Sequence, residues 1–132
     1  MKVAELMQPD VRTIDPDASI ADVVVSLADA HISALPVVDH AGRMLGVVSH
    51  TDVIAVEAEA EERERSELLR DTAVRDIMTP RTLTISPEED VREAARQMLY
   101  AEVHRLFVAS GGDLVGVIST TDIVRAVATG KI

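Results

Sequence analysis

The sequence of 132 residues contains no cysteine and no tryptophan, and only one phenylalanine and one tyrosine. Without cysteine the chain can form no disulfide, no thiolate zinc site and no cysteine nucleophile, which suits a reducing compartment such as the cytoplasm. The scarcity of aromatic rings argues against the stacking platforms that bind single-stranded nucleic acid. The hydrophobic core must therefore be built from aliphatic side chains.

Basic residues are also few, because 13 Lys and Arg stand against 23 Asp and Glu, for a formal net charge of −10. Such a surface repels nucleic acid and anionic membranes. No apolar run approaches the length of a membrane span, and the N-terminus lacks the hydrophobic stretch of a signal peptide. We expect a cytoplasmic protein about one domain long that binds neither nucleic acid nor membranes.

What the sequence does contain is an internal repeat, which decides the interpretation of the whole chain. LMQP at residues 6–9 returns as IMTP at 77–80, and TIDP returns as TISP after the same interval of 71 residues. GVVSHTD at 46–52 returns as GVISTTD at 116–122 after 70 residues, so one residue is lost in the turn between these motifs. The chain therefore consists of two copies of one unit.

Both copies show the same order of local patterns. A short β-branched segment that ends at a proline predicts a strand. Ser19 with Asp22, and Asp90 with Glu93, have the spacing of N-caps before an amphipathic helix. Two apolar segments around a glycine-containing turn predict a hairpin, which leads into a second helix near Thr51 or Thr121. Each copy is thus strand-helix-strand-strand-helix, an α/β (α+β) fold. The expected strands are residues 11–14, 35–38 and 44–48, and then 82–85, 106–109 and 114–118.

An acidic segment separates the copies. Residues 57–71 carry seven acidic and three basic side chains among good helix formers. This composition predicts a solvated extension of the helix that starts near Thr51, with a flexible stretch as the alternative. We expect a first repeat at 1–56, a helical linker at 57–72 and a second repeat at 73–132. Because one copy alone is too small for a substantial core, the two should pack through their sheets as a pseudo-twofold pair.

The ordered set of M-x-P, T-I-x-P, an amphipathic helix, an ALPVVD-like strand and G-V-V/I-S-x-T-D, present twice, resembles the cystathionine β-synthase (CBS) domain. Two such domains in tandem resemble a Bateman module. The resemblance implies a regulatory module that binds adenine nucleotides (AMP, ADP or ATP) or adenosyl compounds such as S-adenosylmethionine in clefts between the repeats. It also implies a homodimer, and a free-standing sensor or a module that regulates a protein partner in trans.

The Ser-x-Thr-Asp segments carry the first set of candidate ligand contacts. Their spacing by itself indicates helix capping, in which the hydroxyl accepts a backbone N–H and the carboxylate lies near the positive end of the helix dipole. The same geometry offers N–H groups and hydroxyls to an anion, and a carboxylate can accept hydrogen bonds from both hydroxyls of a ribose. In the family this aspartate holds ribose. The resemblance therefore assigns ribose to Asp52 and Asp122, and phosphate to Ser49, Thr51, Ser119 and Thr121.

Cationic side chains distinguish the copies. At the start of the second strand, copy two has His104 and Arg105 where copy one has Ser33 and Ala34. The family places a basic pair here to meet the phosphates of a nucleotide whose ribose is held by the other copy. The better-equipped site would combine Ser49, Thr51 and Asp52 with His104 and Arg105, whereas the other would have only Ser33. The alternative for Arg105 is an ion pair with linker glutamates, and in a regular strand Arg105 and its neighbour would face opposite sides.

The remaining candidates would surround an adenine ring or contribute to the core. By resemblance, the adenine pockets would be formed by Val11, Arg12, Thr13 and Val47, and by Thr82, Leu83, Thr84 and Val117. Ordinary core positions in strands are the alternative. The scattered histidines lack a repeated ligand spacing, so no metal site is expected.

Three functions compete at this stage. The leading hypothesis is a non-catalytic adenine-nucleotide sensor. The alternative is a ligand-free dimeric scaffold that works through protein contacts. An enzyme ranks third, because neither copy repeats a metal-binding carboxylate cluster or a nucleophile beside a base.

Overall fold

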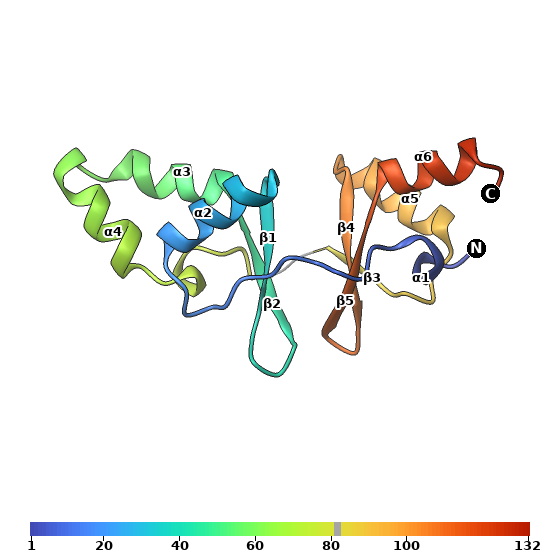
Figure 1. Cartoon of the computed structure of the whole chain (residues 1–132), viewed down its shortest axis with the longest axis horizontal. Coiled ribbons are helices and arrows are strands. Elements are labelled where there is room, and N and C mark those ends of the chain that lie inside the picture. The colour runs from blue at the N-terminus through green and yellow to red at the C-terminus, as the bar shows by residue number, and fades with distance from the viewer. Residues whose placement is uncertain (81–82) are drawn as a thin grey trace. The chain divides into compact units, whose positions relative to one another are not determined.

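The computed structural model describes residues 1–80 and 83–132 and divides the chain into two compact units (Figure 1). The first unit is Arg12–Thr82, and the second unit combines Met1–Val11 with Leu83–Ile132. The N-terminal segment of the first copy therefore packs with the body of the second copy. The corresponding segment of the second copy, around Val74–Thr79, packs with the body of the first. Each compact unit therefore combines the body of one copy with the N-terminal segment of the other copy. We call these two N-terminal segments the exchanged segments.

The first unit has a two-stranded antiparallel sheet covered by helices. The paired strands are joined by a turn at Gly42, whose φ of 88° is accessible to glycine without strain. Buried aliphatic side chains from the sheet and from the first helix form the core, with Leu35, Val37 and Val48 fully enclosed. The elements are α2 (Ile20–Ala30), β1 (Ala34–Val38), β2 (Met44–Ser49), α3 (His50–Glu59), η1 (Glu62–Glu64), α4 (Arg65–Asp71) and η2 (Val74–Asp76).

The second unit has a three-stranded sheet in the order β3-β4-β5, with β3 parallel to β4 and β5 antiparallel to it. Its core again consists of aliphatic side chains, including Leu106, Val108 and Ile118, and it also contains Val3 from the N-terminal segment. The elements are α1 (Val3–Leu6), β3 (Thr84–Ile85), α5 (Val91–Ala101), β4 (Arg105–Ser110), β5 (Asp113–Ser119) and α6 (Thr120–Ala128).

The first strand of each copy is shorter than the sequence predicts. In place of a strand at 11–14, Ile14 alone forms a parallel bridge to Val37. In the second copy β3 has two residues, Thr84–Ile85, and the predicted start at Thr82 lies outside the described residues. The physical reason is the proline two residues after Ile14 or Ile85, which lacks the N–H that would continue the ladder.

The predicted hairpins and helix starts are confirmed. Ser19 is the N-cap of α2 and forms a reciprocal capping box with Asp22. Asp90 caps α5 by accepting the backbone N–H of Arg92 at 2.8 Å. This hydrogen bond stabilises the charged carboxylate and lowers the pKa of Asp90.

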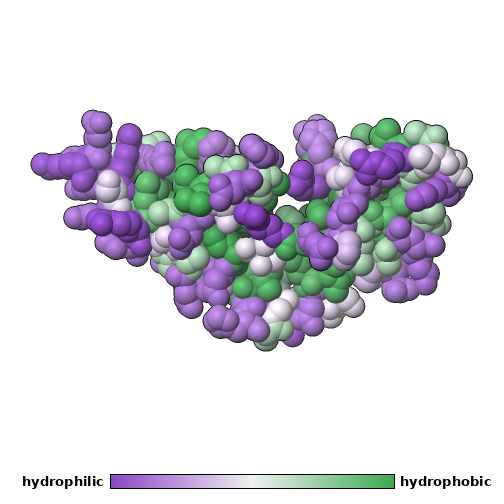
Figure 2. Space-filling model, viewed as in Figure 1, coloured by the Kyte–Doolittle hydropathy of each residue, from purple (hydrophilic) through white to green (hydrophobic). Residues whose placement is uncertain are grey.

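The prediction of one continuous linker helix is wrong in detail. Helix α3 ends at Glu59, Ala60 is extended, and the chain turns through η1 into a separate helix, α4. Acidic residues at the C-terminal end of a helix oppose its dipole and disfavour extension. Leu69 of α4 also packs against the core of the first unit, which favours a return toward α2. Figure 2 shows hydrophilic residues gathered where α3 and α4 form the end of this unit.

Two glycines allow the exchanged segments to approach the sheets. The backbone of Gln8 exchanges two hydrogen bonds with Val117 of β5, and Thr79 does the same with Val47 of β2. A Cβ atom at Gly116 would lie 2.9 Å from the carbonyl oxygen of Gln8, and one at Gly46 would clash with the carbonyl oxygen of Thr79. Only glycine permits this close backbone contact.

Candidate functional site

In each copy the last strand of the hairpin runs directly into a helix whose N-cap is a serine. Ser49 caps α3 and Ser119 caps α6. In both copies the serine N–H donates to the aspartate Oδ2 at 2.8 Å, the serine hydroxyl donates to the same oxygen at 3.0 Å, and the aspartate N–H donates to the hydroxyl at 3.2 Å. The capping spacing predicted from the sequence is confirmed, and it fixes Asp52 and Asp122 in the first turn of each helix.

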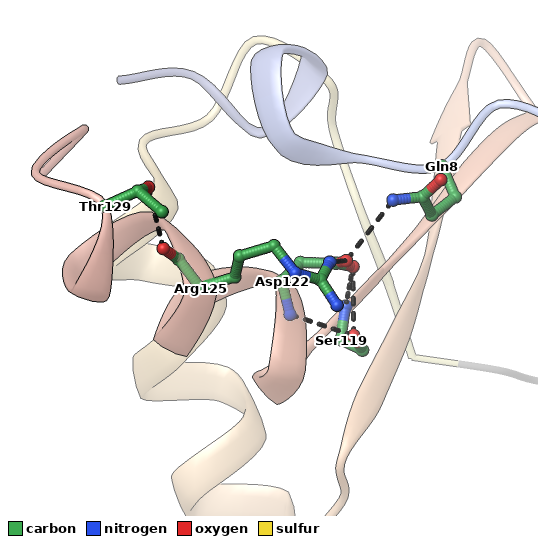
Figure 3. A network of polar contacts seen from close by, with 5 residues as sticks. All are labelled: Gln8, Ser119, Asp122, Arg125 and Thr129. Atoms are coloured by element: carbon green, nitrogen blue, oxygen red, sulfur yellow. Dashed lines mark hydrogen bonds and ion pairs between the residues drawn. The ribbon is translucent and has the colours of Figure 1, made fainter.

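The two aspartates differ at their other carboxylate oxygen. The amide nitrogen of Gln8 donates to Oδ1 of Asp122 at 3.3 Å, and Nη1 of Arg125 lies 3.7 Å from it (Figure 3). Asp122 is accordingly buried, with 8% of its surface exposed, whereas Asp52 is half-buried. Within the described part of the chain, no hydrogen bond or ion pair reaches Oδ1 of Asp52.

Sequence reasoning missed the two residues that create this difference. Gln8 is the variable position of the M-x-P motif, and its counterpart is Thr79. Arg125 follows the aspartate by one helical turn, and its counterpart is Ala55. Comparing the variable positions of the two copies, in addition to the shared ones, would have singled them out.

The threonines and the segments before the second strands lie beside these caps. Thr51 and Thr121 are exposed at the second helical position, so their hydroxyls are accessible. The carbonyl of Ser33 accepts the N–H of His50, and that of His104 accepts the N–H of Thr120, both at 2.9 Å. These hydrogen bonds hold the segment before each second strand against the helix start of the same unit.

Arg105 is the first residue of β4, so His104 lies just outside the regular strand. Arg105 is exposed and stands opposite Ser119 in the β4–β5 ladder, so the two residues lie on the same face of the sheet. His104 instead lines a cavity of about 480 Å³ with Met98, Leu99 and other residues of the helical side. The two predicted phosphate contacts therefore have different surroundings within their own unit.

The predicted adenine contacts fall into different environments. Val47 and Val117 are half-buried at the strand positions that pair with Thr79 and Gln8. Val11 is half-buried and belongs to the second unit, whereas Arg12 and Thr13 are exposed and belong to the first. Leu83 and Thr84 are exposed, and Thr82 lies outside the described residues. Each valine of the β2 or β5 strand thus adjoins an exchanged segment of its own unit.

A polar cavity of about 230 Å³ adjoins Asp122 in the second unit. Its walls come from the N-terminal segment and from α6 with the residues after it. The charged lining residues are Glu5, Asp122, Arg125 and Lys131. Gln8 also lines it, so the residues that contact the Asp122 carboxylate are part of this cavity wall.

Residues 1–80 and 83–132 contain neither a cluster of metal-ligating side chains nor a helix that could span a membrane. No group of three or more His, Cys, Asp or Glu side chains in that part of the chain could hold a metal ion. None of its helices combines the length and the apolar character that crossing a membrane requires.

Comparison with known proteins identifies related sequences and structures. The chain is 30% identical over 126 residues to inosine-5'-monophosphate dehydrogenase from Methanocaldococcus jannaschii, an alignment that covers 94% of this chain and 23% of that enzyme. A crystal structure of CBSX2 in complex with AMP superimposes with a TM-score of 0.82 at 28% identity, covering 99% of this chain and 98% of that one. The CBS domain pair of protein MJ0100, solved with 5'-methylthioadenosine and S-adenosyl-L-methionine, shares the fold with a TM-score of 0.76 at 22% identity, over 100% of this chain and 98% of that one.

The chain spans less than half the length of the first three curated relatives that it matches. A protein-family model, in contrast, matches most of this chain. The model for the CBS domain matches twice, at residues 3–59 and 74–129, which correspond to the two copies seen in the sequence. This protein therefore belongs to the CBS domain family, as a tandem pair of CBS domains.

Proposed function

We propose that this pair of CBS domains is a regulatory module that binds an adenine nucleotide or a related adenosyl ligand through the Ser-x-Thr-Asp segments. The single observation that carries the proposal is the duplicated cap, in which a serine fixes an aspartate carboxylate in the first helical turn beside an exposed threonine hydroxyl. A carboxylate accepts hydrogen bonds from ribose hydroxyls, and a helix N-terminus favours an anion. The likeness to CBSX2, which was crystallised with AMP, supports the same ligand class.

In this proposal Asp52 and Asp122 hold ribose, and the hydroxyls of Thr51, Thr121 and Ser33 donate to phosphate. Ser49 and Ser119 join them by turning the hydroxyls that now donate to the aspartates toward the ligand. His104 and Arg105 add cationic donors, which strengthen phosphate contacts. Val11, Arg12, Thr13, Val47, Leu83, Thr84 and Val117 remain the candidates for adenine, with Thr82. The module performs no chemistry of its own, and the ligand controls an attached domain or a protein partner.

Calorimetric titration of the purified protein with AMP, ADP, ATP and S-adenosylmethionine tests this function. Saturable binding of at least one ligand is expected, and Arg105→Ala should weaken phosphate-bearing ligands by about ten- to a hundredfold while leaving adenosine nearly unchanged. Arg65→Ala, at an exposed arginine at the start of α4, serves as the matched control. Absence of binding by folded protein to all four ligands would contradict the proposal.

The second candidate function is that of a homodimeric interaction module. Exposed apolar side chains on α5 and α6 favour it. Leu99 and Tyr100 of α5 are 79% and 88% exposed, and Val124 and Val127 of α6 are also exposed. An apolar surface of this kind is typical of a protein contact. A dimer is compatible with ligand binding, so the scaffold function becomes the preferred one only if the titrations show no ligand.

A further inference from the structure

Within its own unit the Asp122 carboxylate accepts three hydrogen bonds and also has an arginine beside it. A carboxylate offers about four lone-pair positions. Ser119 uses two of them through its N–H and its hydroxyl, both on Oδ2. Gln8 donates to Oδ1 at 3.3 Å, and the Arg125 guanidinium stands 3.7 Å from the same oxygen (Figure 3). A vicinal diol needs two acceptor positions and only one is left, so it can bind this carboxylate only by displacing a donor, and Arg125 stands beside the remaining position.

The Asp52 carboxylate has the same cap and an unoccupied second oxygen. Ser49 takes two positions on Oδ2 with the distances seen in the other copy. The residues that correspond to Gln8 and Arg125 are Thr79 and Ala55, and neither donates to Oδ1 of Asp52 among the described contacts. Asp52 is also more exposed than Asp122. Its two remaining lone-pair positions are therefore available to a vicinal diol.

We propose that Gln8 and Arg125 close the Asp122 site against ribose, so that Asp52 is the high-affinity diol site of this module. The inference rests on the proposed function and deepens it, because it names the residues that make the two copies unequal. Of the two closing residues, Gln8 lies 114 residues from Asp122 in the sequence, whereas Arg125 lies one turn away in the same helix. Gln8 is held there by its backbone pairing with Val117, and Arg125 by its place one turn along α6.

The two copies provide the matched variants for a test with AMP as the probe. Gln8→Thr with Arg125→Ala gives the second copy the residues of the first. Thr79→Gln with Ala55→Arg does the reverse. Asp52→Asn and Asp122→Asn each keep an oxygen that can accept the serine N–H while removing a second carboxylate acceptor. Circular dichroism and the unfolding midpoint of each variant establish that it is folded.

Calorimetry should give a tight AMP site in the wild type that is lost in Asp52→Asn, and a weaker one that is lost in Asp122→Asn. In the Gln8→Thr, Arg125→Ala variant the affinity of the weaker Asp122 site should rise about tenfold, the effect expected from releasing an amide hydrogen bond and an exposed ion pair. The Thr79→Gln, Ala55→Arg variant should weaken the Asp52 site by about the same factor.

Two results would overturn the inference while leaving the proposed function intact. One is equal loss of AMP binding in Asp52→Asn and Asp122→Asn. The other is weaker binding in the Gln8→Thr, Arg125→Ala variant, which would make these residues ligand contacts. If neither the wild type nor any folded variant binds AMP, ADP, ATP or S-adenosylmethionine, both the proposed function and the inference fail.

Discussion

The carbonyl oxygen of Gln8 lies so close to Gly116 that a Cβ atom added there would stand only 2.9 Å away. The glycine therefore allows the N-terminal segment to pair with β5, and this pairing brings the Gln8 side chain to Asp122. The absence of a side chain at Gly116 thus allows the Gln8 side chain to reach Asp122 in the candidate site.

Gly116→Ala should displace the segment around Met7 and Gln8 and lower the free energy of unfolding by about 1 to 3 kcal/mol, because the Cβ atom would overpack a backbone contact. Hydrogen exchange at the amides of Gln8 and Val117 measures the loss of pairing directly. The amides of Val47 and Thr79 form the same pairing in the other unit and provide an internal control. Unchanged protection at Gln8 would contradict the prediction.

Ser49→Ala removes the hydroxyl that accepts the N–H of Asp52 and should destabilise the protein by about 1 kcal/mol. Ser49→Thr retains a hydroxyl and should recover most of this loss. Ser66→Ala, at an exposed position inside α4, is the matched control and should change stability by less than about 0.5 kcal/mol. Urea unfolding measures the stability of the three variants. A loss in Ser49→Ala that is absent from Ser66→Ala shows that the Ser49 hydroxyl stabilises the helix as its cap.

The N-cap of α5 predicts a pH effect. Its hydrogen bond from the Arg92 N–H holds the pKa of Asp90 below its ordinary value of 3.8. Because the folded-state pKa is lowered, the contribution of Asp90 to stability is present above pH 3.8 and is lost as the pH falls through the folded-state value. A carbon-detected NMR titration of Asp90 should give a midpoint below 3.8, and a midpoint above it would show that the cap does not form.

The return of the linker as α4 depends on Leu69, which packs against the core of the first unit. Leu69→Ala should lower the free energy of unfolding by about 1 to 2 kcal/mol. This is less than the cost of the same substitution at a fully buried leucine, because Leu69 is only half-buried. Leu99→Ala removes the same atoms from a side chain that is 79% exposed and should cost the monomer little. Equal losses in urea unfolding would argue that α4 is not anchored by Leu69.

The exposed side chains of α5 predict self-association. Tyr100→Glu combined with Leu99→Glu places charge on this apolar surface and should convert a dimer into a monomer, as measured by sedimentation equilibrium. Ala41→Glu, at an exposed position in the turn between β1 and β2, adds charge away from the helices and is the control. A wild type that is monomeric at all accessible concentrations would rule out the dimer.

The elements that the sequence predicted well are those with local signals. The caps at Ser19, Ser49 and Ser119 depend on partners three residues away, and the hairpins depend on a turn between two adjacent apolar segments. The prediction of one continuous linker helix failed because Leu69 packs against the core of the first unit. This contact is not visible in the local composition of residues 57–71. The adenine and phosphate contacts were assigned by resemblance alone and remain predictions.

The amino-acid sequence by itself determined that this protein has two copies of one unit, with an aliphatic core and a capped Ser-x-Thr-Asp segment in each. Repetition, periodicity and capping are recorded in neighbouring residues, so they are visible before the chain folds. Only the tertiary structure decided that Met1–Val11 packs with the second copy and that Gln8 meets Arg125 at Asp122, whereas no described residue donates to Oδ1 of Asp52. The Gln8–Asp122 contact joins residues far apart in the chain, and it is selected by close packing around Gly116, which no local pattern encodes.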